Sequence, residues 1–141
     1  MNKILIAVDD GPTAEKVASN GLLIGRQLNA EIALISVVAD DATLITDGGI
    51  TPAEMANIFK NDFKKAQQQL VDKVFKDYKV WAFVEEGKPF ETILKVAGEW
   101  EADFIVLGTH GRTGLSHLLM GSVAEKVIRH STKPLFVIPT R

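Results

Sequence analysis

Short apolar runs alternate along the chain with longer stretches of helical periodicity. Residues 4–8, 32–38 and 104–107 are continuous runs of β-branched or aliphatic residues, which are typical of strands covered on both faces. Two further runs, 80–84 and 135–138, have the same character, and the last one lies between Pro134 and Pro139. The pattern therefore predicts five buried strands.

The stretches between these runs predict four helices. In the clearest one, apolar residues recur every three or four positions with Lys or Asp between them: Met55, Phe59, Phe63, Ala66, Leu70, Val74 and Tyr78. The helix predicted over 13–28 contains Gly21 and Gly25, each of which costs roughly 1 kcal/mol relative to Ala in a helix interior. Their i, i+4 spacing places both on one face and favours close packing on a sheet. A third helix begins near Pro89, and a fourth covers about 121–130.

The alternation of strand and helix predicts an α/β fold with a parallel sheet covered by helices on both faces. No internal repeat or linker divides residues 1–141, so we expect a single domain. Two stretches lie outside the pattern. Residues 39–51 are acidic and form either a lid or a surface loop, and residues 109–120 connect the fourth strand to the last helix.

Composition and charge narrow the function classes. With 46% hydrophobic and 24% charged residues the chain is of globular type, and a net charge of −2 argues against a general nucleic-acid-binding surface. Residues 108–133 nevertheless carry a local net charge of +3, which suggests an anionic ligand nearby. The absence of cysteine excludes disulfides, thiolate zinc sites and cysteine nucleophiles. No signal-peptide pattern and no run of roughly 18 apolar residues occurs, so we expect a cytoplasmic protein without membrane association.

Candidate chemistry follows the strands, because ligands of open α/β sheets bind beyond the carboxyl ends of the strands. Residues 9–11 (Asp-Asp-Gly) follow the first strand, and the glycine-rich stretch 108–114 follows the fourth. Glycines let backbone amides approach an anion, and a helix that begins near Gly121 and Ser122 adds unpaired N–H groups. Arg112 adds a cation within the loop. These features predict a phosphate cradle; the alternative is a long turn shaped by glycines, with Ser122 as a helix cap.

Two well-known nucleotide motifs are missing. The sequence Gly87-Lys88 is followed by Pro89 rather than by the Ser or Thr of a Walker motif. The even spacing of Gly108, Gly111 and Gly114 also departs from the dinucleotide-binding pattern.

The spacing Gly108-x2-Gly111-x9-Gly121-Ser122 resembles the signature of the ATP-binding universal stress proteins, and the similarity extends along the whole chain. Gly87-x-Pro89, Ala102-Asp103 and Lys133-Pro134 agree with that family as well. The resemblance implies a doubly wound, five-stranded parallel sheet in the order 3-2-1-4-5 with four helices on both faces. It also implies a bound adenine nucleotide and a homodimer formed through the last strand, Leu135–Ile138.

The resemblance also implies where the nucleotide binds. The phosphates would meet the amides of the glycine loop and of the last helix: Gly108, Gly111, Gly121, Ser122, Val123 and Ala124. Ala7, Asp9, Val37 and Leu107 would surround the ribose and adenine, and His110 and Arg112 lie in the phosphate loop. ATP is the expected ligand, with AMP or ADP as alternatives, and Mg or Mn would arrive with the phosphates. The chain departs from the family at Gly11, where a serine commonly stands.

Three other function classes match parts of the sequence: a receiver domain, a hydrolase, and a flavin or electron carrier. A receiver domain would explain Asp9-Asp10, but the third strand ends in Glu85-Glu86-Gly87 without an acceptor aspartate. A hydrolase needs a nucleophile beside a base, and neither Ser116 nor the three histidines fall into such a motif. His110 can contact phosphate, whereas His117 and His130 suit surface or capping positions.

A flavin or electron carrier is the third alternative, because related folds bind such cofactors at the same edge. The preferred hypothesis is a stress-response regulator that acts through nucleotide-dependent conformation or through binding of an unidentified protein partner, with at most slow ATP hydrolysis.

Overall fold

The computed structural model describes residues 2–39, 49–111 and 120–140, which form a single parallel sheet with helices on both faces. The elements are β1 (Lys3–Ala7), α1 (Ala14–Leu28), β2 (Glu31–Ala39), α2 (Pro52–Lys73), β3 (Val80–Gly87), α3 (Pro89–Glu99), β4 (Phe104–Gly108), α4 (Ser122–His130) and β5 (Leu135–Ile138). The strand order is β3-β2-β1-β4-β5, and every pair of neighbours is parallel. The predicted fold class and strand order are therefore confirmed.

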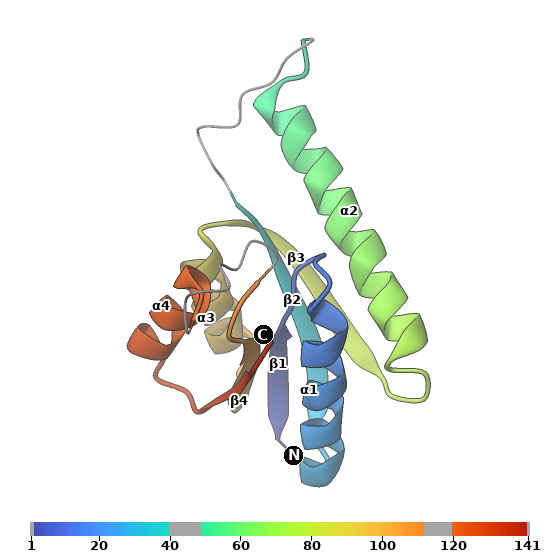
Figure 1. Ribbon diagram of the computed structural model, residues 1–141, viewed down its shortest axis with the longest axis vertical. Helices are drawn as coiled ribbons and strands as arrows, with labels where there is room; N and C mark the ends of the chain where they lie inside the picture. The colour runs from blue at the N-terminus through green and yellow to red at the C-terminus, as the bar shows by residue number, and fades with distance from the viewer. Residues whose placement is uncertain (1, 40–48, 112–119, 141) are drawn as a thin grey trace.

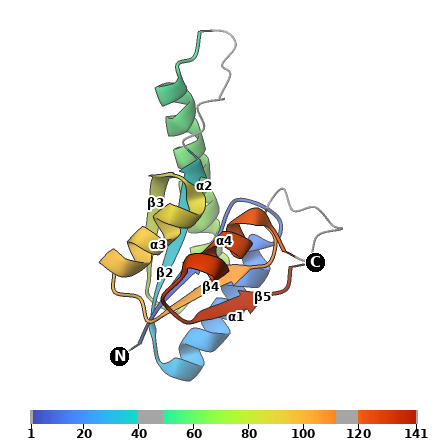
Figure 2. The ribbon, with the colours of Figure 1, turned by 90° about the vertical axis from the view of Figure 1, so that its left-hand side faces the viewer.

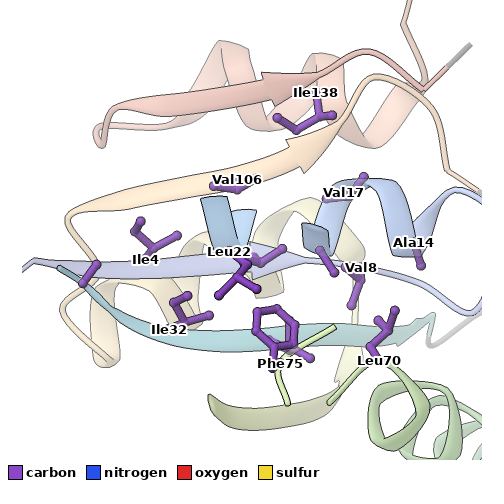
Figure 3. Close-up of a cluster of buried hydrophobic side chains, with 14 residues drawn as sticks. Ile4, Val8, Ala14, Val17, Leu22, Ile32, Leu70, Phe75, Val106 and Ile138 are labelled. Carbon is purple, nitrogen blue, oxygen red and sulfur yellow. The ribbon is translucent and has the colours of Figure 1, made fainter. Parts of the chain in front are cut away.

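The sheet separates two hydrophobic clusters. Alternate residues of β1 point to opposite faces, so that Ile4 and Ile6 pack toward α1 and α2 while Leu5 packs toward α3 and α4. Figure 3 shows the first cluster, in which Val17 and Leu22 of α1 lie over the sheet. Figures 1 and 2 show the same division, with α1 and α2 on one face and α3 and α4 on the other. Both faces of the central strands are thus buried.

The two glycines of α1 allow this helix to lie close to the sheet, as predicted. A Cβ atom at Gly25 would lie 2.6 Å from Cδ1 of Ile32, and one at Gly21 would overlap Cδ1 of Ile6. Both isoleucines are fully buried. The missing side chains therefore serve packing.

Helix α2 is shorter than its periodicity predicted. The apolar spacing continues to Tyr78, but the helix ends at Lys73. Tyr78 lies in the following turn, where its hydroxyl donates a hydrogen bond to the carbonyl of Ala30. The helix begins with a capping box, in which Thr51 Oγ1 accepts from Glu54 N.

Much of α2 lies away from the core. Its buried residues, Gln67 and Leu70, belong to its carboxyl-terminal half. Figure 1 shows the amino-terminal half extending past the carboxyl edge of the sheet. Met55 and Phe59, predicted to be on a core-facing side, are only partly buried.

The expectation of five buried strands is correct for β1, β2 and β4 but wrong for β3. This strand reaches Gly87 instead of ending near residue 84, and Trp81 is 37% exposed. The cause is its position at one edge of the sheet, where within the described residues it pairs with β2 alone. The other edge is β5, whose first three residues are partly exposed.

Candidate functional site

A cavity of about 570 Å³ lies at the carboxyl ends of the central strands. β1 and β4 are neighbours, yet β1 leads into α1 on one face and β4 leads toward α4 on the other. Strands whose connections diverge in this way leave a crevice beyond their carboxyl ends. The cavity occupies this topological switch point.

The structure brings the predicted site residues together. The cavity is lined by Ala7, Asp9, Val37, Leu107, Gly108, His110, Gly111, Gly121, Ser122, Val123 and Ala124, which are the predicted residues apart from Arg112. Arg112 lies outside the described residues, as does His117. His130, predicted to suit the surface, is exposed at the end of α4, where its ring stacks on Phe90 with 5.4 Å between the ring centroids.

One part of the cavity is apolar. Ala7, Val37 and Leu107 lie at or within two residues of the carboxyl ends of three neighbouring strands, and they line it together with Ile35 and Ile93. Phe63 of α2 also contributes, although no feature of the sequence distinguishes it from the other apolar residues of that helix. A flat apolar group such as a heterocyclic base fits walls of this kind.

Asp9 stands where β1 opens into the cavity. Its Oδ1 accepts a hydrogen bond of 2.8 Å from the backbone N–H of Gly11. Its Oδ2 lies 2.9 Å from the position that a Cβ atom at Gly111 would occupy. The loop after β4 therefore passes directly against this carboxylate, and only a residue without a side chain fits there without moving Asp9.

The loop after β4 returns to the start of α4 by a backbone hydrogen bond. The N–H of Gly121 donates to the carbonyl of Thr109 over 2.6 Å. Gly121 is the N-cap residue of α4, and Ser122 is the first residue of the helix, so the interpretation of Ser122 as the cap is wrong. A glycine cap has no side chain to satisfy the first amides of the helix, and those amides lie at the cavity wall.

His110 is more enclosed than a surface histidine. It is 7% exposed, and its Nδ1 lies 3.1 Å from Oγ1 of Thr109. Its backbone N–H donates to Oγ1 of Thr140 over 2.9 Å. Thr140 follows β5 and was not predicted to contact the site. It lies 30 residues from His110 along the chain, and no sequence pattern connects the two positions.

The polar groups of the cavity include backbone amides and two carboxylates. Among residues 2–39, 49–111 and 120–140 the His, Asp and Glu side chains form no group of three or more that could hold a metal ion. Asp9 and Asp10 nevertheless bring two carboxylates to the cavity. Where the structure describes the chain, no helix is both long and apolar enough to span a membrane.

Comparison with known proteins agrees with this architecture. Residues 1–139 match the universal stress protein family. Universal stress protein MJ0531 of Methanocaldococcus jannaschii is 31% identical over 141 residues, which cover 96% of this chain and 81% of the relative. Universal stress protein MJ0577 of the same organism is 30% identical over 152 residues, which cover 96% of this chain and 93% of the relative.

Solved structures share the fold over nearly the whole chain. The structure of MJ0577 superposes with a TM-score of 0.85 at 28% identity and covers 99% of this chain and 96% of that one. Universal stress protein UspA from Lactobacillus plantarum has a TM-score of 0.85 at 23% identity, with 97% of each chain covered. The chain therefore belongs to the universal stress protein family.

Proposed function

We propose that this universal stress protein binds an adenine nucleotide in the cavity between β1 and β4 and acts as a regulator whose conformation or partner binding depends on that ligand. ATP is the first candidate, and ADP and AMP are the alternatives. One observation carries the proposal: the glycine loop, the start of α4 and an apolar pocket all line the same cavity. A nucleotide needs both kinds of surface at once.

The cavity suggests an orientation for the nucleotide. The apolar residues Val37, Leu107 and Ile35 would hold the adenine, because the faces of the purine ring can pack against aliphatic side chains. The phosphates would lie at Gly111 and at the start of α4, where backbone N–H groups and the helix dipole favour negative charge. Asp9 between these parts would accept hydrogen bonds from ribose hydroxyls.

A divalent cation fits this arrangement as a companion of the phosphates. Asp9 and Asp10 would repel a bare triphosphate, and Mg²⁺ or Mn²⁺ bound to the phosphates would reduce that repulsion. Two carboxylates on successive residues provide oxygen ligands of the kind that such ions prefer. The protein would then contribute to a metal site that is completed only by the nucleotide.

Relatives support the class of ligand. A universal stress protein has been solved in complex with cAMP, and one from Archaeoglobus fulgidus in complex with dAMP. At 16% and 20% identity these structures share the fold with this chain, with TM-scores of 0.74 and 0.71. Adenine as the base is supported by these relatives, and ATP as the first candidate by the resemblance of Gly108-x2-Gly111-x9-Gly121-Ser122 to the signature of ATP-binding family members.

The test combines identification of a co-purified ligand with calorimetry. Ligand released by denaturation should absorb near the adenine band and chromatograph as an adenine nucleotide, whereas a flavin would colour the protein yellow. Titration of ligand-free protein with Mg-ATP should give a micromolar dissociation constant, which corresponds to about 8 kcal/mol.

The Gly111→Val substitution should weaken ATP binding on the order of 100-fold or more, equivalent to about 2.7 kcal/mol. The new Cβ would stand 2.9 Å from Asp9 Oδ2 and force this carboxylate away from Gly11, and the methyl groups would fill the phosphate path. Gly98→Val is the matched control, because nothing among the described residues lies within 4 Å of a Cβ there. Equal ATP affinity of wild type and Gly111→Val would rule out the cradle.

The proposal includes a homodimer formed through β5. Within the described chain this edge strand pairs with β4 alone, and Ile128 on the neighbouring helix α4 is 40% exposed. The carbonyls of Pro134 and Ile138 face β4, where they accept from the N–H groups of Ile105 and Thr109. Successive residues of a strand direct their backbone N–H and C=O groups to opposite sides, so the N–H of Val137 points to the open edge. A second copy could pair there through an isologous contact.

A further inference from the structure

Thr140 lies between the two parts of the molecule to which the proposed function assigns ligand binding and dimerisation. β4 and β5 run in parallel with Gly108 beside Ile138, so the segments that leave them continue side by side. Thr140 is two residues beyond β5, and Thr109 and His110 are the first two residues beyond β4. One segment continues the proposed pairing strand, and the other opens the proposed phosphate loop.

The hydroxyl and amide of Thr140 are both bonded to that loop. Its Oγ1 accepts from the N–H of His110 over 2.9 Å and donates to the carbonyl of the same residue over 3.1 Å. Its own N–H donates to Oγ1 of Thr109 over 3.1 Å, and the two threonine hydroxyl oxygens lie 3.2 Å apart. A single side chain therefore fixes both backbone polar groups of His110.

The methyl group of Thr140 completes the contact. Its Cγ2 lies 2.7 Å from the position that a Cβ atom at Gly108 would occupy, so the first glycine of the loop is where Thr140 packs. Pro139 precedes it, and the fixed φ of proline limits how far Thr140 can move independently of β5. A shift of β5 would thus be transmitted to residues 108–110.

We infer that Thr140 is a positioning residue that couples nucleotide binding to pairing of a second copy at β5. The inference rests on the proposed function. A second copy would fix the position of β5, and Thr140 would then hold residues 108–110 in one geometry. The backbone amide of Gly111 would thereby be placed for the phosphates before the nucleotide binds. Thermodynamic linkage requires the reverse effect of equal size, so that ATP tightens the dimer.

The experiment measures the dimer dissociation constant by sedimentation with and without saturating Mg-ATP. We expect ATP to tighten the wild-type dimer at least about 5-fold, the lower end of common coupling factors. Thr140→Val keeps the shape but removes the hydroxyl, and it should reduce this factor to less than about 2-fold. Thr140→Ser keeps the hydroxyl and should restore most of the coupling. Thr132→Val, at an exposed position before β5, is the matched control and should behave as wild type.

A second measurement does not depend on nucleotide. Amide hydrogen exchange at His110 should be faster in Thr140→Val than in wild type, and close to wild type in Thr140→Ser, because the Thr140 hydroxyl accepts that N–H. Unchanged exchange in Thr140→Val would overturn the inference. So would a wild-type dimer that binds ATP without being tightened, or a Thr140→Val dimer with full coupling. A wild-type protein that binds no nucleotide would refute the proposed function together with the coupling, while the exchange result would still report whether Thr140 holds the loop.

Discussion

Gln67 is the residue whose replacement we expect to be most informative about stability. It lies on α2 and is 3% exposed, and its Nε2 donates to acceptors on two strands: Oγ of Ser36 and the carbonyl of Phe83, each over 2.9 Å. Ser36 is itself 1% exposed, and its hydroxyl in turn donates a hydrogen bond to the carbonyl of Val8 over 2.8 Å. This chain of hydrogen bonds ties α2 to β2 and β3 and reaches the exit of β1.

Gln67→Leu should lower the free energy of unfolding by about 2–4 kcal/mol. The substitution preserves most of the buried volume but removes two hydrogen bonds, each worth about 0.5–1.5 kcal/mol net. It also leaves the carbonyl of Phe83 without its side-chain donor and the Ser36 hydroxyl with an empty acceptor position, and a buried polar group that loses its partner costs about 1–3 kcal/mol. The added apolar contact of Leu offsets part of this loss.

The assay is urea unfolding of the ligand-free protein at one fixed concentration, so that the proposed dimer contributes equally to every variant. With a slope of roughly 2 kcal/mol per molar urea, the midpoint should fall by about 1–2 M. Gln68→Leu is the control at the next position. Among the described residues the Nε2 of Gln68 bonds to exposed Asp72 alone, over 2.9 Å, and loss of this hydrogen bond should cost less than about 0.5 kcal/mol. A Gln67→Leu effect as small as that of the control would refute the reasoning.

A double-mutant cycle measures how much of this stability comes from the interaction between Gln67 and Ser36. Ser36→Ala removes the hydroxyl that Gln67 and Val8 share, and the double variant should be less destabilised than the sum of the two single variants by about 1 kcal/mol. Strict additivity would show that Gln67 and Ser36 act independently.

The remaining predictions concern helix packing and the sheet edge. Gly25→Ala should lower the free energy of unfolding by about 1–2 kcal/mol, because the clash with fully buried Ile32 outweighs the better helix propensity, whereas Gly98→Ala in open space should raise it by up to about 1 kcal/mol. Urea unfolding measures both free energies, and a stabilising effect of Gly25→Ala would show that the side chain of Ile32 can move aside. Val137→Pro should convert the proposed dimer to monomer in sedimentation while the β4 ladder persists, since the lost N–H faces the open edge. A Val137→Pro protein that remains dimeric would place the interface elsewhere.

The sheet could be predicted because its signals are local. Buried parallel strands are short apolar runs, and the glycine spacing in α1 reports directly on helix-to-sheet contact at Gly25. The same locality explains the error at β3, since the apolar run 80–84 resembles a central strand although Trp81 lies at an edge. Exposure of a strand depends on which strands flank it, and residues within the strand do not encode that.

The helix periodicity failed for a related reason. Apolar spacing continues through Val74 to Tyr78, but the apolar contacts of Tyr78 are made from a turn, where its hydroxyl reaches Ala30. Conversely Gln67, a polar residue on a helix rich in Lys and Asp, shows no sign in the sequence of being buried. Its burial depends on Ser36 and the carbonyl of Phe83, which only the folded sheet brings to one place.

The candidate site shows the same contrast between neighbouring and distant residues. Gly108, Gly111 and Gly121 are close in sequence, and together with the helix start and the local positive charge they predict a cradle. Thr140 contacts the beginning of this stretch because two parallel strands end in register, which places its hydroxyl against the amide of His110. The hydroxyl of Ser36 does for β1 what that of Thr140 does for β4: each bonds to backbone polar groups just beyond the strand, at Val8 and at His110. β1 and β4, two of the strands that border the cavity, are thus each bonded just beyond their carboxyl ends by a hydroxyl from the neighbouring strand or its extension. Gln67, which bonds to Ser36, connects α2 to the first of these contacts.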